Sequence, residues 1–90
     1  MSKAAVAGLT RGLARDLGPR GITVNNVQPG PVDTEMNPDK GDFAGVIKGF
    51  LALGRYGKSD EIASFVAFLA SEEAGYITGA SLTIDGGFAA

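Results

Sequence analysis

Residues 21–34 read GITVNNVQPGPVDT, and this stretch decides the fold class. Its first part, Ile22 to Val27, is rich in β-branched residues and predicts a strand opened by Gly21. Two prolines and a glycine follow within Gln28–Pro31. They predict that the strand ends there, because proline has no N–H to give to a sheet. The stretch therefore predicts a strand that leads directly into a loop.

A helix is predicted before this strand, over residues 3–17. Its apolar face recurs at helical spacing: Val6, Leu9, Leu13 and Leu17. Gly8 and Gly12 lie on a second strip, and each costs a helix about 1 kcal/mol against alanine. That strip suggests close packing against another backbone. Gly18-Pro19 predicts where the helix ends.

Further elements are predicted after the loop. Residues 32–58 look irregular, with a short helix near 43–52. A second helix begins with Ser59 as its N-cap and runs to about residue 71, and a short strand covers 82–84. Two strands joined by a long crossover imply parallel neighbours. A parallel sheet needs both faces covered, which two short strands cannot provide. The fold class is therefore α/β, and the sheet is incomplete by itself.

Composition excludes several classes of protein. The 44% hydrophobic and 20% charged content is typical of a folded globular domain. A net charge of −2 without a basic patch gives no support for binding nucleic acid or an anionic membrane. The absence of cysteine and histidine removes disulfides and the commonest metal ligand, so no metal site is expected. No apolar run is long enough to cross a membrane, and the expected location is the cytoplasm.

Several segments, taken in order, resemble the second half of the short-chain dehydrogenase/reductase family. They are Ser2–Ala5, Gly21–Asn25, Pro29–Thr34, Tyr76–Gly79 and Asp85–Gly87. Each motif is weak alone, but together they cover essentially the whole chain in register. The resemblance implies a Rossmann-like, doubly wound parallel sheet, of which residues 1–90 are the C-terminal segment of a single NAD(P)-binding domain. Two branches are similar: the cyclic-di-GMP-binding biofilm dispersal mediators and the acyl-carrier-protein ketoreductases.

The resemblance implies an oxidoreductase that uses NAD or NADP and moves a hydride between the nicotinamide and a carbonyl or alcohol substrate. Lys3 matches the family's catalytic lysine, which lies one helical turn after a catalytic tyrosine. A nearby ammonium lowers the pKa of a phenol from its usual value near 10. The same lysine hydrogen-bonds the nicotinamide ribose. The alternative is a solvated lysine near the start of a helix, with Ser2 as N-cap.

Pro29, Gly30, Val32 and Thr34 are the other candidate cofactor-binding residues. They follow the carboxyl end of a strand, where ligands bind in open α/β sheets. Gly30 lets backbone approach a flat ring. By resemblance, Val32 offers main-chain groups to the nicotinamide carboxamide, and the Thr34 hydroxyl bonds the same amide or a phosphate. The alternative is a turn without a ligand. A bare structural domain is disfavoured, because the pattern has no structural need of Thr34.

Several parts of the family's machinery are not among these 90 residues. They are the Gly-rich dinucleotide loop, the residue that selects NAD or NADP, and the catalytic serine and tyrosine. The aligned tyrosine falls two residues before Met1, so we expect a piece of a longer enzyme that is inactive alone. A homo-oligomer, dimer or tetramer, is expected through the helix at residues 3–17 and the C-terminal segment. The competing hypothesis is a non-catalytic nucleotide-binding or oligomerisation module.

Overall fold

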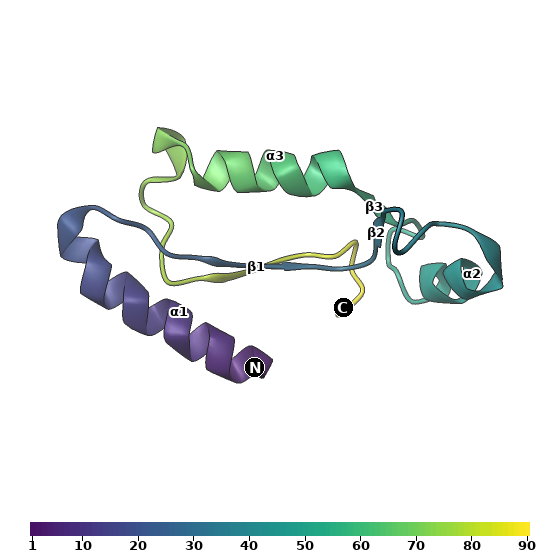
Figure 1. Ribbon diagram of the computed structural model, residues 1–90, viewed down its shortest axis with the longest axis horizontal. Coiled ribbons are helices and arrows are strands. Elements are labelled where there is room, and N and C mark those ends of the chain that lie inside the picture. The colour runs from purple at the N-terminus through teal and green to yellow at the C-terminus, as the bar shows by residue number, and fades with distance from the viewer. The chain divides into compact units, whose positions relative to one another are not determined.

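The computed structural model describes residues 1–90, which divide into two compact units. The first unit comprises residues 1–27 and 66–82, and the second comprises 28–65 and 83–90. Each unit is described by itself, and a single domain segment over residues 1–90 stays a prediction. In order, the elements are α1 Lys3–Leu17, η1 Gly18–Arg20, β1 Asn26–Pro29, β2 Val32–Asp33, α2 Gly41–Gly49, β3 Gly57–Lys58, α3 Ser59–Leu69, η2 Glu72–Ala74 and β4 Ser81–Ile84 (Figure 1).

Helix α1 of the first unit has the predicted bounds. Ser2 is its N-cap, and the Ser2 hydroxyl accepts a hydrogen bond from the Ala5 N–H at 3.1 Å. Gly18 is the C-cap, after which Pro19 opens the 3-10 turn η1 instead of continuing the α-helix. The chain reverses at Gly21, whose φ of 74° favours glycine.

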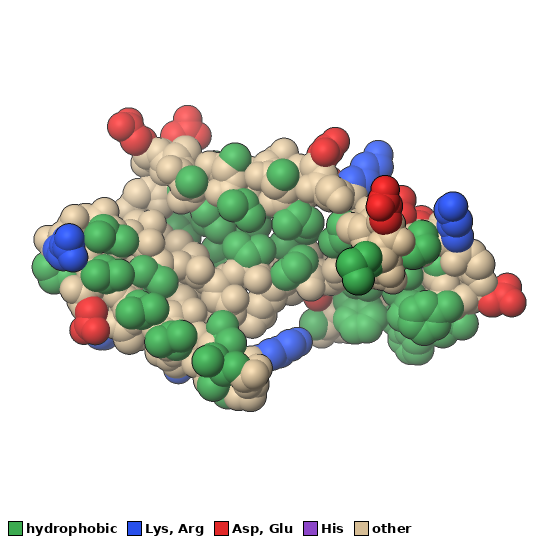
Figure 2. Space-filling model, viewed as in Figure 1, with side chains coloured by type: hydrophobic (Ala, Val, Ile, Leu, Met, Phe, Trp, Pro, Cys, Tyr) green, Lys and Arg blue, Asp and Glu red, His purple; other side chains and the backbone are tan.

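The apolar face of α1 is largely uncovered within its unit. Only Thr10 and Ala14 are buried, whereas Leu9 is 52% exposed and Leu13 is 38% exposed. Figure 2 shows hydrophobic side chains at the surface over α1. No atom lies within 4 Å of a Cβ placed on Gly8 or Gly12. These glycines have no packing partner inside this chain, so their close packing against another backbone stays a prediction.

The strand predicted over residues 22–27 is observed as β1, which begins four residues later and ends two residues later than predicted. Before β1, side chains replace part of the backbone ladder. The Val24 N–H donates to the Thr78 hydroxyl at 3.0 Å. The Asn25 amide donates to the Ile77 carbonyl at 3.0 Å and accepts from the Ala80 N–H at 3.2 Å. Hydrogen bonds to polar side chains thus delay the start of the regular strand.

Strands β1 and β4 form a two-stranded sheet. The Asn26 N–H donates to the Ala80 carbonyl at 2.9 Å, and the Gly30 N–H donates to the Ile84 carbonyl at 3.1 Å. Residue numbers rise together along both strands, so the pairing is parallel. Because alternate residues face one neighbour, the nitrogen of Pro29 points away from β4. This alternation explains why β1 includes a proline that we expected to end it.

The second unit contains a short sheet that the sequence did not predict. Strand β2 pairs in parallel with β3, with Val32 opposite Gly57 and Asp33 opposite Lys58. Helix α2 confirms the expected short helix, although it begins two residues earlier and ends three residues earlier. Its inner side contributes to a core of Ala44, Leu51 and Tyr56, with Ile47 packed against it.

Helix α3 begins one residue differently from the prediction. Lys58 lies in the N-cap position, and its N–H donates to the Glu61 carboxylate at 3.0 Å. Ser59 is therefore the first helical residue and not the cap. Glu61, three residues after Lys58, supplies the carboxylate half of a capping box. No helix of the chain combines the length and the apolar content needed to span a bilayer.

Candidate functional site

The four predicted loop residues all lie in the second unit, within residues 29–34. Pro29 ends β1, Gly30 follows it, Val32 opens β2, and Thr34 comes directly after β2. The structure therefore places this part of the candidate site at the carboxyl end of a parallel strand, as expected. Lys3 belongs to the first unit, where it is exposed as the first residue of α1.

Gly30 has a structural reason to be glycine. A Cβ at this position would lie 2.6 Å from the Asp85 Cβ and 2.8 Å from the Asp85 Cα. Asp85 is itself fixed, because its carboxylate accepts from the Gly87 N–H at 2.9 Å and from the Ala89 N–H at 3.1 Å. The missing side chain of Gly30 thus makes room for the C-terminal turn that follows β4. A role for Gly30 toward a flat ring stays a prediction.

Thr34 also has a structural partner, so our expectation that the fold has no need of it was wrong. The Thr34 hydroxyl oxygen accepts from the Asn37 N–H at 3.1 Å. The two residues also exchange backbone hydrogen bonds of 3.3 and 3.2 Å. The hydroxyl proton is not used in these contacts, since the oxygen acts only as an acceptor. Thr34 therefore combines a turn-stabilising role with one free donor.

The rest of this loop is held by acidic side chains. The Asp33 carboxylate accepts from the Asp39 N–H at 2.9 Å. Asp39 in turn forms an ion pair with Lys48 of α2 at 2.6 Å. These contacts order the segment between β2 and α2, which the sequence suggested was irregular.

The pairing of β2 with β3 leaves the main-chain groups of Val32 free. The Gly57 N–H donates to the Pro31 carbonyl at 2.9 Å, so Gly57 is the residue whose polar groups face β2. In a parallel ladder, the opposite residue then turns its N–H and C=O the other way. Val32 is that residue. One donor and one acceptor, close together and rigidly held, are what recognition of a carboxamide requires.

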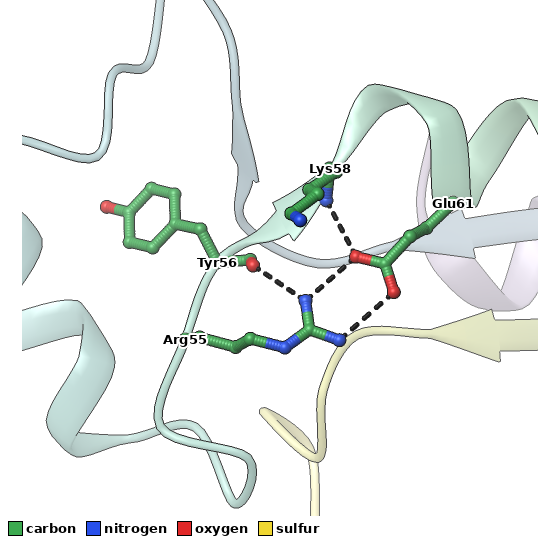
Figure 3. Close-up of polar contacts among 4 residues, drawn as sticks. All are labelled: Arg55, Tyr56, Lys58 and Glu61. Carbon is green, nitrogen blue, oxygen red and sulfur yellow. Dashed lines mark hydrogen bonds and ion pairs between the residues drawn. The ribbon is translucent and has the colours of Figure 1, made fainter.

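A charged pair lies directly behind this ladder (Figure 3). The Arg55 guanidinium donates to both carboxylate oxygens of Glu61, at 2.8 and 3.0 Å. It also donates to the Tyr56 carbonyl at 3.1 Å. Glu61 accepts the Lys58 N–H as well, at 3.0 Å. A hollow of about 100 Å³ lies beside the pair, lined by residues that include Val32, Arg55, Glu61 and Asp85.

These contacts shift the protonation of both partners. The hydrogen bond from Arg55, and then that from the Lys58 N–H, lower the pKa of Glu61 from 4.5 to about 2. The hydrogen bond to Glu61, and then its charge, raise the pKa of Arg55 above its ordinary value. The pair therefore stays ionised over the whole range in which proteins usually fold.

We expect an NMR titration of the Glu61 carboxyl carbon to give a pKa near 2. Because the folded-state pKa is depressed, the pair's contribution to stability is fully present above pH 4.5 and is lost as the pH falls through about 2. Arg55→Gln removes the largest cause, so the pKa of Glu61 rises. It stays below 4.5 because the Lys58 N–H still donates. An equal pKa in both proteins would contradict the observed geometry.

Arg55 and Glu61 receive no role from the sequence patterns. A signal was available in the three-residue spacing from Lys58 to Glu61, which is that of a capping box. The spacing of six residues between Arg55 and Glu61 has no comparable local rule. Only the fold shows that the two side chains meet.

The parallel strands, the crossover between them and the loop after β1 define a Rossmann-like α/β protein. Residues 1–89 match the family described as enoyl-(acyl carrier protein) reductase, and the chain belongs to this family of short-chain dehydrogenases/reductases. This confirms the resemblance and the fold class inferred from the sequence.

Two curated relatives represent the two branches named from the sequence. The cyclic-di-GMP-binding biofilm dispersal mediator protein of Escherichia coli is 53% identical over 99% of this chain and 38% of its own length. The 3-oxoacyl-[acyl-carrier-protein] reductase FabG of Pseudomonas aeruginosa is 46% identical over 96% of this chain and 35% of its own length. The chain thus spans little more than a third of these relatives.

Solved structures agree with the fold. A short-chain dehydrogenase/reductase from Serratia marcescens is 73% identical, with a TM-score of 0.94, over 98% of this chain and 36% of that one. A short-chain dehydrogenase from Burkholderia cenocepacia, solved in complex with NADP, is 55% identical with a TM-score of 0.90, over the same shares.

Proposed function

We propose that residues 1–90 form the nicotinamide-binding second half of an NAD(P)-dependent oxidoreductase, which moves a hydride between the cofactor and a carbonyl or alcohol substrate. The observation that carries this proposal is the free main chain of Val32. Its N–H and C=O are left unpaired by the β2–β3 ladder, at the carboxyl end of β1. A carboxamide fits there because it offers one acceptor and one donor.

The relatives support this assignment. FabG is named as a 3-oxoacyl-[acyl-carrier-protein] reductase, and the B. cenocepacia protein was solved with NADP. NADP is therefore the cofactor to test first, with NAD as the alternative.

Two side chains complete the proposed chemistry. Thr34 has a hydroxyl proton free to donate to the carboxamide or to a phosphate, since its oxygen only accepts from Asn37. Lys3 is exposed at the start of α1, and in the proposed enzyme it holds the nicotinamide ribose and lowers the pKa of the catalytic tyrosine. When bound, the nicotinamide supplies or accepts the hydride.

A binding or oligomerisation module without catalysis is the second candidate. The uncovered apolar residues of α1, with Leu9 and Leu13 exposed, favour a partner for this helix, such as a second copy of the chain. The name of the E. coli relative describes binding of cyclic-di-GMP, which is a binding function without a stated reaction. NADPH turnover separates the two candidates.

We expect no NADPH oxidation by the 90-residue chain, because no residue in it corresponds to the family's catalytic tyrosine. The test is a chimera in which residues 1–90 replace the matching segment of the B. cenocepacia dehydrogenase. The proposal expects the chimera to bind NADPH, measured by cofactor fluorescence, and to reduce carbonyl substrates. Turnover by the isolated chain, or a folded chimera that does not bind NADPH, would contradict the proposal.

A further inference from the structure

We propose that Arg55 and Glu61 are positioning residues for the nicotinamide site. Through β3 they hold β2 in the register that turns the Val32 main chain toward the cofactor. This inference rests on the proposed function, because it assigns the pair to the same loop. Neither residue touches the cofactor in this proposal.

The Arg55–Glu61 pair bonds to the backbone on both sides of Gly57. Arg55 donates to the carbonyl of Tyr56, and Glu61 accepts from the N–H of Lys58. Gly57, which lies between these two, gives the N–H that bonds the Pro31 carbonyl. Figure 3 shows the two charged side chains joined beside this short segment. The two peptide groups that flank Gly57, one of which contains the Gly57 N–H itself, are therefore both tied to the same ion pair.

Strand β3 needs such a support. It has only two residues, and one of them is glycine, which has no side chain to pack and the largest backbone freedom. A parallel pair this short is too small to hold its register alone. On one side the buried ring of Tyr56, 4% exposed, anchors the chain. On the other side only the Lys58 N–H and its bond to Glu61 fix where α3 begins.

The exposure of the pair distinguishes positioning from general stabilisation. The Arg55 and Glu61 side chains are 49% and 41% exposed. Exposed ion pairs typically make only a small contribution to the free energy of unfolding, and a bidentate pair lies toward the upper end of that range. A bidentate guanidinium–carboxylate contact nevertheless fixes direction more tightly than a single bond. Loss of the pair is therefore expected to disturb the β2–β3 register far more than the overall stability.

The experiment uses the chimera with the B. cenocepacia dehydrogenase. We expect Arg55→Gln and Glu61→Gln each to raise the KM for NADPH on the order of tenfold. Even a small displacement of the Val32 main chain weakens its hydrogen bonds to the cofactor. We expect kcat at saturating NADPH to change by less than about twofold, since no transition-state contact is removed. Arg55→Lys keeps the positive charge but loses the planar guanidinium that donates to both carboxylate oxygens. Its KM for NADPH is therefore expected to lie between those of the native chimera and Arg55→Gln.

Lys40→Gln is the control, because it removes an exposed charged side chain of the same unit that forms no ion pair. It is expected to leave the KM for NADPH unchanged. Unchanged KM values in both Arg55→Gln and Glu61→Gln would overturn the proposal. So would an equal rise in the Lys40→Gln control, or a fall in the thermal midpoint large enough to explain the rise.

A second measurement keeps the inference separate from the proposed function. If the chimera with the native pair does not bind NADPH, the proposed function fails. Hydrogen exchange on the 90-residue chain then tests whether Arg55 and Glu61 hold the β2–β3 register. We expect the Gly57 amide to exchange about tenfold faster in Arg55→Gln, since its bond to Pro31 opens more often. Equal exchange at Gly57 in the two proteins would overturn the positioning role.

Discussion

Gly30→Ala should destabilise the chain by about 2–4 kcal/mol, which is the cost of overpacking at a site that cannot relax. The new methyl group would lie 2.6 Å from the Asp85 Cβ and 2.8 Å from its Cα. Asp85 has little room to retreat, because its carboxylate holds the Gly87 and Ala89 N–H groups. Urea unfolding followed by circular dichroism measures the change in the free energy of unfolding.

Gly45→Ala provides the control with the opposite sign. Gly45 lies inside α2, and no atom lies within 4 Å of a Cβ placed there. Replacing an unconstrained helical glycine by alanine should stabilise the chain by about 0.5–1 kcal/mol. If both variants changed stability in the same direction, the close approach of Gly30 to Asp85 would not be the cause.

Lys3→Met should lower kcat/KM of the chimera by about 10²–10⁴, the range that one acid–base group contributes. Removal of the ammonium takes away the charge that favours the phenolate and one contact to the nicotinamide ribose. The pH optimum should therefore also move to higher pH, because the pKa of the tyrosine returns toward its usual value near 10. Steady-state kinetics over a range of pH measures both effects.

Lys40→Met is the control for this variant. Lys40 is also exposed and lies at the start of a helix, as the N-cap residue of α2, but it has no proposed role. It should leave kcat/KM within about twofold of the unchanged chimera, as surface substitutions usually do. Unchanged kinetics in the Lys3→Met chimera would contradict the proposed role of Lys3. Lys3 would then be a solvated lysine at the start of a helix.

The helices were predictable because their signals are local. The bounds of α1 follow from Ser2 at one end and Gly18-Pro19 at the other, where capping chemistry acts within a few residues. The start of β1 was not predictable, because it depends on Asn25 and Val24 bonding to residues 77–80, more than fifty positions away. No local pattern reports such a partner.

The candidate site shows the same division. A loop after the carboxyl end of β1 was expected from the Pro-Gly-Pro run. The free main chain of Val32 was not derivable from residue types, because it depends on β2 pairing with the two-residue strand β3. Thr34 gave a wrong inference for a related reason: its partner is the N–H of Asn37, and any residue except proline supplies such a group. Side-chain patterns do not report main-chain partners.

The alternation of β1 also determines how another strand could pair with its edge opposite β4. The edge of β1 opposite β4 presents Val27 with both polar groups, but Pro29 with a carbonyl alone. A foreign strand that approached this edge would find one N–H donor within β1 and then a proline ring. Uncontrolled strand addition needs an unbroken row of donors, and prolines on sheet edges interrupt it. Pro29 therefore limits how far misfolded copies can extend a sheet from this edge, whatever else the loop after it binds.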